Sequence, residues 1–436
     1  MDLLKNIFKG DKIIWILFMG LCLISIIEVF SAASTLTYKT GDHWGPITQH
    51  TIFLAIGVLI VVLMHHIPYK WFQVFPLFLL PISAVMLVFV TAMGIITGDR
   101  VNGAARWMSF MGFQFQPSEL AKMAVIIATA FILSKKQDEA GAQPQAFKFI
   151  LLITSGICVL IAPENLSTAM LLFAVVILMM FIGRVAMKQM AKLFGALVLI
   201  GGLTVAVILI VPQDTELPLL HRLATWKSRI IHFADKEEIP AARFDIDKNG
   251  QVAHARIAIA TSHLAGKGPG NSVQRDFLSQ AFSDFIFAII IEELGLIFGC
   301  IPMVFIYICI LIRAGRIAQK CERTFPAFLV MGIALMLVSQ AILNMMVAVG
   351  LFPVTGQPLP LVSKGGTSTF INCAYIGMIL SVSRYTQKLE ENRRQQELLQ
   401  AAQQALVPTE VTETAEAAEP TAPILNSDAE FVNEER

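Results

Sequence analysis

Runs of apolar residues separated by short polar segments dominate this chain. A helix needs about 20 predominantly apolar residues to cross a bilayer, and several runs reach that length. The pattern predicts an all-α polytopic membrane protein with ten transmembrane helices. The predicted helices are Ile13–Ser34, Thr51–Met64, Phe75–Ile96, Pro117–Ser134, Phe149–Ile161, Thr168–Ile182, Leu193–Val211, Asp284–Ile312, Phe325–Val349 and Thr367–Ser383.

The longest polar segment, 212–283, contains no apolar run of spanning length. It is predicted as a large extracytoplasmic loop between helices 7 and 8. The predicted membrane domain covers residues 1–384 and includes this loop. The remaining residues, 385–436, are predicted as a cytoplasmic tail that starts with helical composition. From Val407 onward Pro, Thr, Ala and Glu dominate, which predicts a disordered end.

Composition agrees with a membrane protein. The chain is 56% hydrophobic and 15% charged, whereas soluble globular proteins carry roughly 25% charged residues. Six cysteines lie in or beside predicted helices, so no disulfide framework is predicted. The net charge is +1, and the charged residues are distributed unequally among the loops. No nucleic-acid partner is predicted.

Lysines and arginines divide unequally between the two sets of loops. Cytoplasmic loops are enriched in these residues, so the richer set is predicted to be cytoplasmic. This places both termini in the cytoplasm and the large loop outside, in the cytoplasmic (inner) membrane. The richer set holds Lys5, Lys9, Lys12, Lys70, Lys135, Lys136, Lys148, Arg184, Lys188, Lys192, Arg313, Arg316, Lys320 and Arg323, and the poorer set holds Lys39, Arg100, Arg106 and Lys364.

Asp284 is the first candidate for chemistry, because it lies where the polar loop meets an apolar helix. An ionisable group at membrane depth is costly unless it has a partner or a task. One alternative is structural: Ser283 or Asp284 caps the helix. The others are functional: a general base for a sugar hydroxyl, or a ligand for a divalent cation on a diphosphate.

Two further groups of charged residues have both structural and functional interpretations. Glu119 and Lys122 are three residues apart on one helix face and form either a structural ion pair or a diphosphate contact. Arg106 precedes Trp107 at the predicted outer interface. Arg222 and Arg229 recur at helical spacing, which fits an amphipathic helix or a phosphate clamp.

The segment Gly350–Ser368 holds three prolines and four glycines at predicted membrane depth. Such backbone is tolerated only when it is buried in protein or lines a cavity. A structural loop is one interpretation, and a cavity wall is favoured. The candidate substrate contacts here are Gln340, Asn344, Ser363, Lys364 and Ser368.

Three weaker patterns are set aside. Residues 245–250 begin like a calcium loop, but the twelfth position is Arg256 rather than a bidentate glutamate, so a polar turn is predicted. The sequence Gly266–Gly270, GKGPG, lacks the rest of a nucleotide-binding motif and is predicted as a turn. His65 and His66 have no other ligands nearby in the sequence.

Four motifs together resemble the SEDS (shape, elongation, division and sporulation) family, the lineage that includes FtsW, RodA and SpoVE. The motifs are FQPSELAK at 115–122, SDFIFAIIIEELG at 283–295, PVTGQPLPLVSKGGTS at 353–368 and GMILSVSR at 377–384. The resemblance covers nearly the whole predicted membrane part. Within the family, residues 28–34 and the charged tail favour the cell-division branch.

This resemblance implies a peptidoglycan glycosyltransferase that polymerises lipid II on the outer membrane face, with Asp284 as the essential carboxylate. The lipid diphosphate is the leaving group, so no nucleotide is expected. Implied partners are lipid II, undecaprenyl-diphosphate-linked glycan, a class B penicillin-binding protein and other divisome proteins. Asp284 is the expected ligand of any bound Mg²⁺ or Mn²⁺. The alternatives are a lipid II flippase, an elongation-type polymerase and a non-catalytic scaffold.

The chain departs from the common family pattern at several positions. Asn165 and Ser167 stand where relatives commonly have Asp and Gly, and Phe282 and Ser283 stand in place of His and Thr. Lys364 stands where tyrosine is common.

Overall fold

The computed structural model describes residues 8–32, 45–96, 107–110, 113–139, 141–210, 246–278 and 281–406. Helices dominate this part of the chain, which confirms the all-α prediction, and its strands form two short antiparallel hairpins. The helices are α2 (Lys12–Ala32), α4 (Gly45–His66), η1 (Tyr69–Gln73), α5 (Phe75–Ile96), α6 (Pro117–Lys135), α7 (Pro144–Ile161), α8 (Leu166–Ile182), α9 (Met187–Ile210), α11 (Ile246–Ala260), η3 (Gln274–Asp276), α12 (Ile286–Gly295), η4 (Leu296–Cys300), α13 (Ile301–Gln319), α14 (Thr324–Ala348) and α15 (Gly366–Leu406). The strands are β1 (Met108–Phe110), β2 (Phe113–Phe115), β3 (Gln137–Asp138) and β4 (Gly141–Ala142).

The polytopic architecture is as predicted. Eight helical stretches in the described part of the chain are long and apolar enough to cross a membrane. Helix α8 is apolar but has only 17 residues, and the first half of α15 coincides with the tenth predicted span. The count of ten therefore stays a prediction.

The eighth predicted span coincides with one apolar helical stretch, Ile286–Gln319, which is interrupted rather than regular. Helix α12 ends at Gly295, whose φ is +75°, and the chain continues through the π-helical η4 into α13. A Cβ at Gly295 would lie 2.4 Å from the amide nitrogen of Gly266. Two glycines therefore let the backbones meet where the helix breaks.

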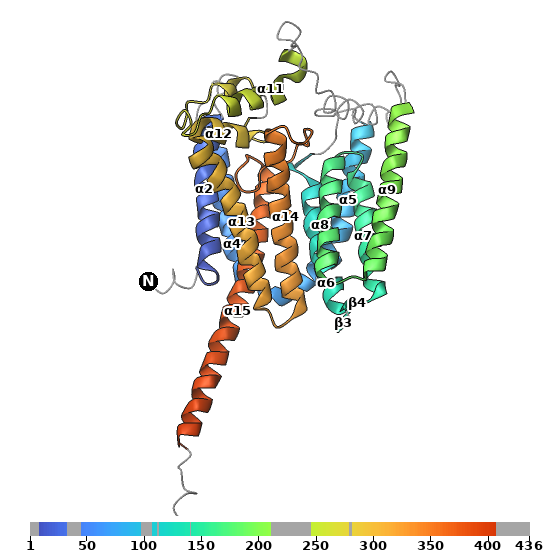
Figure 1. Ribbon diagram of the computed structural model, residues 1–436, viewed down its shortest axis with the longest axis vertical. Helices are drawn as coiled ribbons and strands as arrows, with labels where there is room; N and C mark the ends of the chain where they lie inside the picture. The colour runs from blue at the N-terminus through green and yellow to red at the C-terminus, as the bar shows by residue number, and fades with distance from the viewer. Residues whose placement is uncertain are drawn as a thin grey trace, which may run out of the picture. The chain divides into compact units, whose positions relative to one another are not determined.

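Helices α6 and α14 form the centre of the first unit of the chain, Met1–Gln387. In the membrane-spanning stretches of α6 and α14, 78% and 67% of the residues are buried, compared with 11% in α9. Small residues let α6 approach its neighbours closely, notably Ala121 and Ala124. Figure 1 shows α14 between α13 and α8, with α11 and α12 together at one end of these helices.

The second unit is Lys388–Arg436. Its described residues, up to Leu406, continue α15 as a helix with mostly exposed side chains. The sequence there is rich in Glu, Gln and Arg, which favour helix without supplying an apolar face. Residues 407–436, where a disordered end is predicted, lie outside the described residues.

Candidate functional site

The chain between α14 and α15 runs without regular structure, and side chains of the surrounding helices hold its backbone. An unpaired carbonyl group costs several kcal/mol in hydrocarbon, so such a segment needs donors from the protein. Three helices supply them, which places the loop inside the protein. The bonds run from Asn344 to the carbonyl of Gln357 (2.8 Å), from Gln340 to Pro358 (3.0 Å), from Tyr307 to Pro360 (2.5 Å) and from Ser25 to Val362 (2.7 Å).

Asp284 lies against this loop and is half-buried. Its own carbonyl accepts a second hydrogen bond from Asn344 Nδ2, at 2.9 Å. The Ser363 hydroxyl donates to the carbonyl of Ser283 (2.6 Å), and the Ser283 hydroxyl donates to the Asp284 carboxylate (3.1 Å). Several hydrogen bonds to the neighbouring backbone thus fix the position of the carboxylate.

The capping alternative for Asp284 is wrong in this structure. Helix α12 begins at Ile286, and its N-cap residue is Phe285, with no side-chain hydrogen bond to the helix end. Asp284 lies one residue before that cap. Asp284 is therefore not the N-cap residue of α12.

Lys364 lies beside the same segment. Its backbone N–H donates to the carbonyl of Phe282 (2.9 Å), and its ammonium group lies 5.6 Å from the centre of the Phe282 ring. Within the described part of the chain this ammonium makes no ion pair. Burial removes water from the charged form and lowers the pKa of Lys364 below its ordinary value.

Glu119 and Lys122 form the predicted pair on α6. The Lys122 ammonium lies 2.7 Å from the Glu119 carboxylate and donates to the side-chain carbonyl of Gln340 at 2.9 Å. Both charged side chains are closed off, at 1% and 2% exposure. Gln340 also holds the loop at Pro358, so the pair supports the same loop as Asn344. This geometry fits the structural alternative for the pair.

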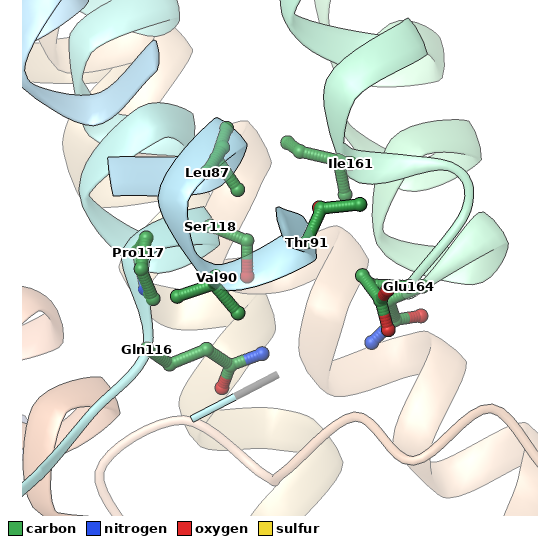
Figure 2. A pocket seen from close by; sticks show the side chains of 9 residues that line it. Leu87, Val90, Thr91, Gln116, Pro117, Ser118, Ile161 and Glu164 are labelled. Carbon is green, nitrogen blue, oxygen red and sulfur yellow. The ribbon is translucent and has the colours of Figure 1, made fainter. Parts of the chain in front are cut away.

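A small pocket lies between α5, the start of α6 and the α7–α8 turn (Figure 2). Asn165 caps α8 by accepting the Thr168 N–H at 3.1 Å, while its buried amide nitrogen makes no hydrogen bond to the described part of the chain. The surface that lines it is mostly apolar, and the residues around it are Leu87, Val90, Thr91, Gln116, Pro117, Ser118, Ile161, Glu164 and Asn165.

Hydrogen bonds connect this pocket to Asp284. The Thr168 hydroxyl accepts from the side-chain amide of Gln357 at 2.5 Å. The carbonyl of Gln357 and the carbonyl of Asp284 both accept from Asn344. The pocket, the loop and Asp284 therefore belong to one polar network.

Several predicted site residues are not brought into this network. Arg106, Arg222 and Arg229 lie outside the described residues. Ser368 is buried, and its hydroxyl accepts only from Asn372 within the described part, at 3.3 Å. The polar turn predicted at 245–250 is wrong for its described residues, because α11 begins at Ile246.

Sequence reasoning gave no role to Glu292 and Glu293, which are fully buried near the end of α12. They bind the glycine-rich segment, where Gly266, Gly268 and Gly270 all have positive φ as a tight turn requires. The sequence did contain a signal for these residues. Two adjacent acids stand inside an apolar run, at the C-terminal end of a helix, where the helix dipole disfavours negative charge.

A sequence profile of the family described as "Cell cycle protein" (FTSW_RODA_SPOVE) matches residues 11–388. The chain belongs to the FtsW/RodA/SpoVE family. Two members named "Probable peptidoglycan glycosyltransferase FtsW" align over most of their length. The protein from Geobacter sp. (strain M18) is 30% identical, covering 87% of this chain and 98% of the relative. The protein from Trichlorobacter lovleyi is 31% identical, covering 88% and 96%.

Solved structures of the FtsW/RodA/SpoVE family share the fold. A chain from "Structural coordination of polymerization and crosslinking by a peptidoglycan synthase complex" superposes with a TM-score of 0.67 at 22% identity, covering 86% of this chain and 98% of that chain. The rod shape determining protein RodA of Thermus thermophilus gives a TM-score of 0.59 at 22% identity, covering 87% and 98%. The chain is therefore a multi-pass membrane protein of this fold.

Proposed function

We propose that this protein is a peptidoglycan glycosyltransferase of the FtsW type, which polymerises lipid II at the outer face of the cytoplasmic membrane during cell division. The relatives' names support the reaction. One structural observation carries the site. Asp284 is a half-buried carboxylate that precedes α12 without capping it, and three hydrogen bonds hold it and Ser283.

Asp284 acts as the general base. It takes the proton from the acceptor sugar hydroxyl of lipid II as that oxygen attacks the anomeric carbon of the growing glycan. The new carbon–oxygen bond forms as the bond to the diphosphate breaks, with inversion at the anomeric carbon. The leaving group is the undecaprenyl diphosphate, which departs with the electron pair. The geometry around Asn344 and Ser363 keeps the base in place for this step.

Lys364 contributes to substrate binding. Lys364 lies beside Phe282 with its charge unpaired among the described residues, which suits a diphosphate oxygen.

Asp284 would hold a divalent cation, and the cation would neutralise charge on the leaving diphosphate. No cluster of three or more His, Cys, Asp or Glu side chains lies within the described residues. Mg²⁺ usually binds one or two carboxylates together with substrate phosphates and water, so a single aspartate fits this role. Arg106, Arg222 and Arg229 remain candidate diphosphate contacts.

The partner is a class B penicillin-binding protein, which crosslinks the peptides of the new glycan. Both termini are cytoplasmic, in keeping with the distribution of lysine and arginine. The similar solved chain comes from a peptidoglycan synthase complex, which supports such a partner. Other divisome proteins are further expected partners.

The decisive experiment uses purified protein and fluorescent lipid II. Asp284→Asn should abolish glycan polymer while leaving the melting temperature unchanged, because the amide keeps the shape but cannot accept the proton. Asp138→Asn is the matched control, since that carboxylate is exposed in β3 and should retain full activity. Undiminished polymer from Asp284→Asn would refute the role of this residue.

A lipid II flippase is the rival function. It predicts that the unmodified protein moves fluorescent lipid II across a vesicle membrane and forms no polymer. It also predicts that Asp284→Asn moves lipid II at the same rate as the unmodified protein. The elongation-type alternative is not favoured, because the relatives reported above carry the FtsW name. Depletion in cells distinguishes the two branches: filaments indicate division, and rounded cells indicate elongation.

A further inference from the structure

Glu292 and Glu293 occupy an unfavourable place. Both side chains are fully buried, and both lie in the last turn of α12. The C-terminal end of a helix carries a partial negative charge that repels acids. Burying a carboxylate is costly unless hydrogen bonds and cations compensate it. Two adjacent buried acids at this position therefore need an explanation in the surrounding structure.

Glu292 receives four donors from one short segment. The Lys267 ammonium lies 2.6 Å from its carboxylate, and the Ser272 hydroxyl donates at 2.5 Å. The backbone N–H groups of Val273 and Gln274 donate at 3.2 and 3.3 Å, where η3 begins. One carboxylate thus organises the segment from Lys267 to Gln274.

Glu293 binds the same segment and also a distant helix. The backbone N–H groups of Gly270 and Ser272 donate to its carboxylate at 2.9 and 3.3 Å. The Ser31 hydroxyl of α2 donates to it as well. Arg275 lies 4.0 Å from the carboxylate and donates to the Ser31 hydroxyl at 3.0 Å. Glu293 therefore ties the segment to both α12 and α2.

Backbone contacts complete this arrangement, which we call the carboxylate clamp (Glu292, Glu293 and the segment 266–275 that they bind). The N–H groups of Lys267 and Gly268 donate to the carbonyls of Glu292 and Glu293, at 3.0 and 2.8 Å. A Cβ on Gly266 would lie 2.2 Å from the Glu293 carbonyl oxygen. The segment is thus pressed against the helix end without any side chain between them.

Asp284 lies at the other end of the same helix. Helix α12 has ten residues, nine of them buried, and spans roughly 15 Å. Its beginning is held by Asn344 and Ser363, which bind the carbonyls of Asp284 and Ser283. A short buried helix fixed at both ends behaves as a rigid element, so a shift at one end moves the other.

We propose that Glu292 and Glu293 are positioning residues for Asp284. The carboxylate clamp fixes the end of α12 against the extracytoplasmic segment and α2, and α12 carries that constraint to the carboxylate. The clamp touches no substrate and acts only through the helix. This inference rests on the proposed function of Asp284.

The test combines hydrogen exchange with kinetics on the full-length protein. Glu293→Gln keeps the size of the side chain but removes the charge that Gly270, Ser272 and Ser31 bind. We expect faster amide exchange in residues 266–276 and also in the first turn of α12. We expect kcat for lipid II polymerisation to fall about tenfold to a hundredfold, because a small misplacement of a reacting group has effects of that size, with KM within about twofold.

The matched control is Glu397→Gln, which removes an exposed carboxylate in the second unit and should change neither readout. Faster exchange confined to 266–276, with the first turn of α12 and kcat unchanged, would overturn the proposal. If Glu293→Gln does not fold, Ser31→Ala removes one donor of the clamp and should show the same two effects at smaller size. Unchanged exchange and kcat in Ser31→Ala would then overturn it.

The exchange measurement separates this inference from the proposed function. If Asp284→Asn remains fully active, the role of Asp284 fails whatever the clamp does. If Asp284→Asn is inactive and Glu293→Gln leaves kcat and the first turn of α12 unchanged, only the positioning role fails. Lys267→Met should fall between the control and Glu293→Gln, since Glu292 keeps three other donors.

Discussion

The ion pair inside α6 and the carboxylate clamp at the end of α12 compensate buried carboxylates in different ways. Glu119 and Glu292 are both nearly inaccessible to solvent. Glu119 is compensated by Lys122, three residues along the same helix. Glu292 is compensated by a lysine, a hydroxyl and two backbone N–H groups from a segment about twenty residues earlier.

The two arrangements differ in which part of the structure depends on the buried charge. In α6 the pair binds no backbone group of the loop itself in the described structure, and it reaches the loop through the side chain of Gln340. In the carboxylate clamp the backbone of the loop itself binds the acids, so the conformation of the loop depends on them. In the first region the two charges lie on one helix and reach a second helix through Gln340, whereas in the second region the acids bind the backbone of a separate segment directly.

Lys122→Met should have the largest effect on stability. It leaves the Glu119 carboxylate buried without a cation, and breaking a buried pair in this way costs about 3–5 kcal/mol. We expect a clear fall in the melting temperature of detergent-purified protein, together with loss of polymerisation. Lys148→Met on the exposed face of α7 is the control and should stay near the unmodified value. An unchanged melting temperature in Lys122→Met would mean that the pair contributes little.

Gly266→Ala should have the next largest effect, because it separates the segment from α12 without touching a charge. The new Cβ would lie 2.2 Å from a backbone carbonyl, at a φ of +77°. Gly270→Ala is the matched control: its φ is +82°, but nothing lies within 4 Å of the added carbon. Gly270→Ala should lower the free energy of unfolding by about 1 kcal/mol through backbone strain alone. Gly266→Ala should lower it by more than that. Equal melting temperatures would contradict the close packing of this segment.

Lys267→Met should have a smaller effect on stability, about 1 kcal/mol. The Lys267 side chain is 26% exposed, and solvent screens its share of the attraction. A double-mutant cycle with Glu292→Gln measures the coupling between the two residues. A coupling free energy as large as the loss of stability in Lys122→Met would contradict this comparison, because both carboxylates would then depend on their lysines to the same extent.

Glu28→Gln should have the smallest effect and the opposite sign. This α2 side chain is fully buried, and neither of its carboxylate oxygens makes a hydrogen bond in the described structure. It thus lacks both kinds of compensation found at Glu119 and Glu292. A carboxyl group at this place must either keep a charge without a partner or bind a proton, and a neutral amide of the same size avoids both costs, so the melting temperature should rise slightly. A fall would indicate that Glu28 has a partner that matters.

The sequence predicted those features that depend on a local period. Apolar runs predicted the helices, and the spacing of Glu119 and Lys122 placed both on one face of α6, as the structure confirms. The break at Gly295 was not predicted, because an isolated glycine inside an apolar run is common in membrane helices. Its effect appears only when Gly266 approaches it.

Contacts between distant segments could not be predicted. The binding of Glu293 to Gly270 and Ser31 follows no period, and neither does the binding of Gln357 to Thr168. Polar residues near Gly350–Ser368 were expected to matter, but their partners are particular carbonyl groups that only the folded backbone brings within reach. The sequence identified which residue types were unusual at membrane depth, and the structure identified what each one binds.

The irregular chain between α14 and α15 has a consequence for biogenesis. Its carbonyl groups find their donors on α2, α13 and α14, so it cannot settle until the first and the last parts of the polypeptide have come together in the bilayer. A half-inserted chain would hold these groups unsatisfied and would remain a target for quality-control proteases. Maturation of the reaction centre thus coincides with completion of the whole membrane assembly.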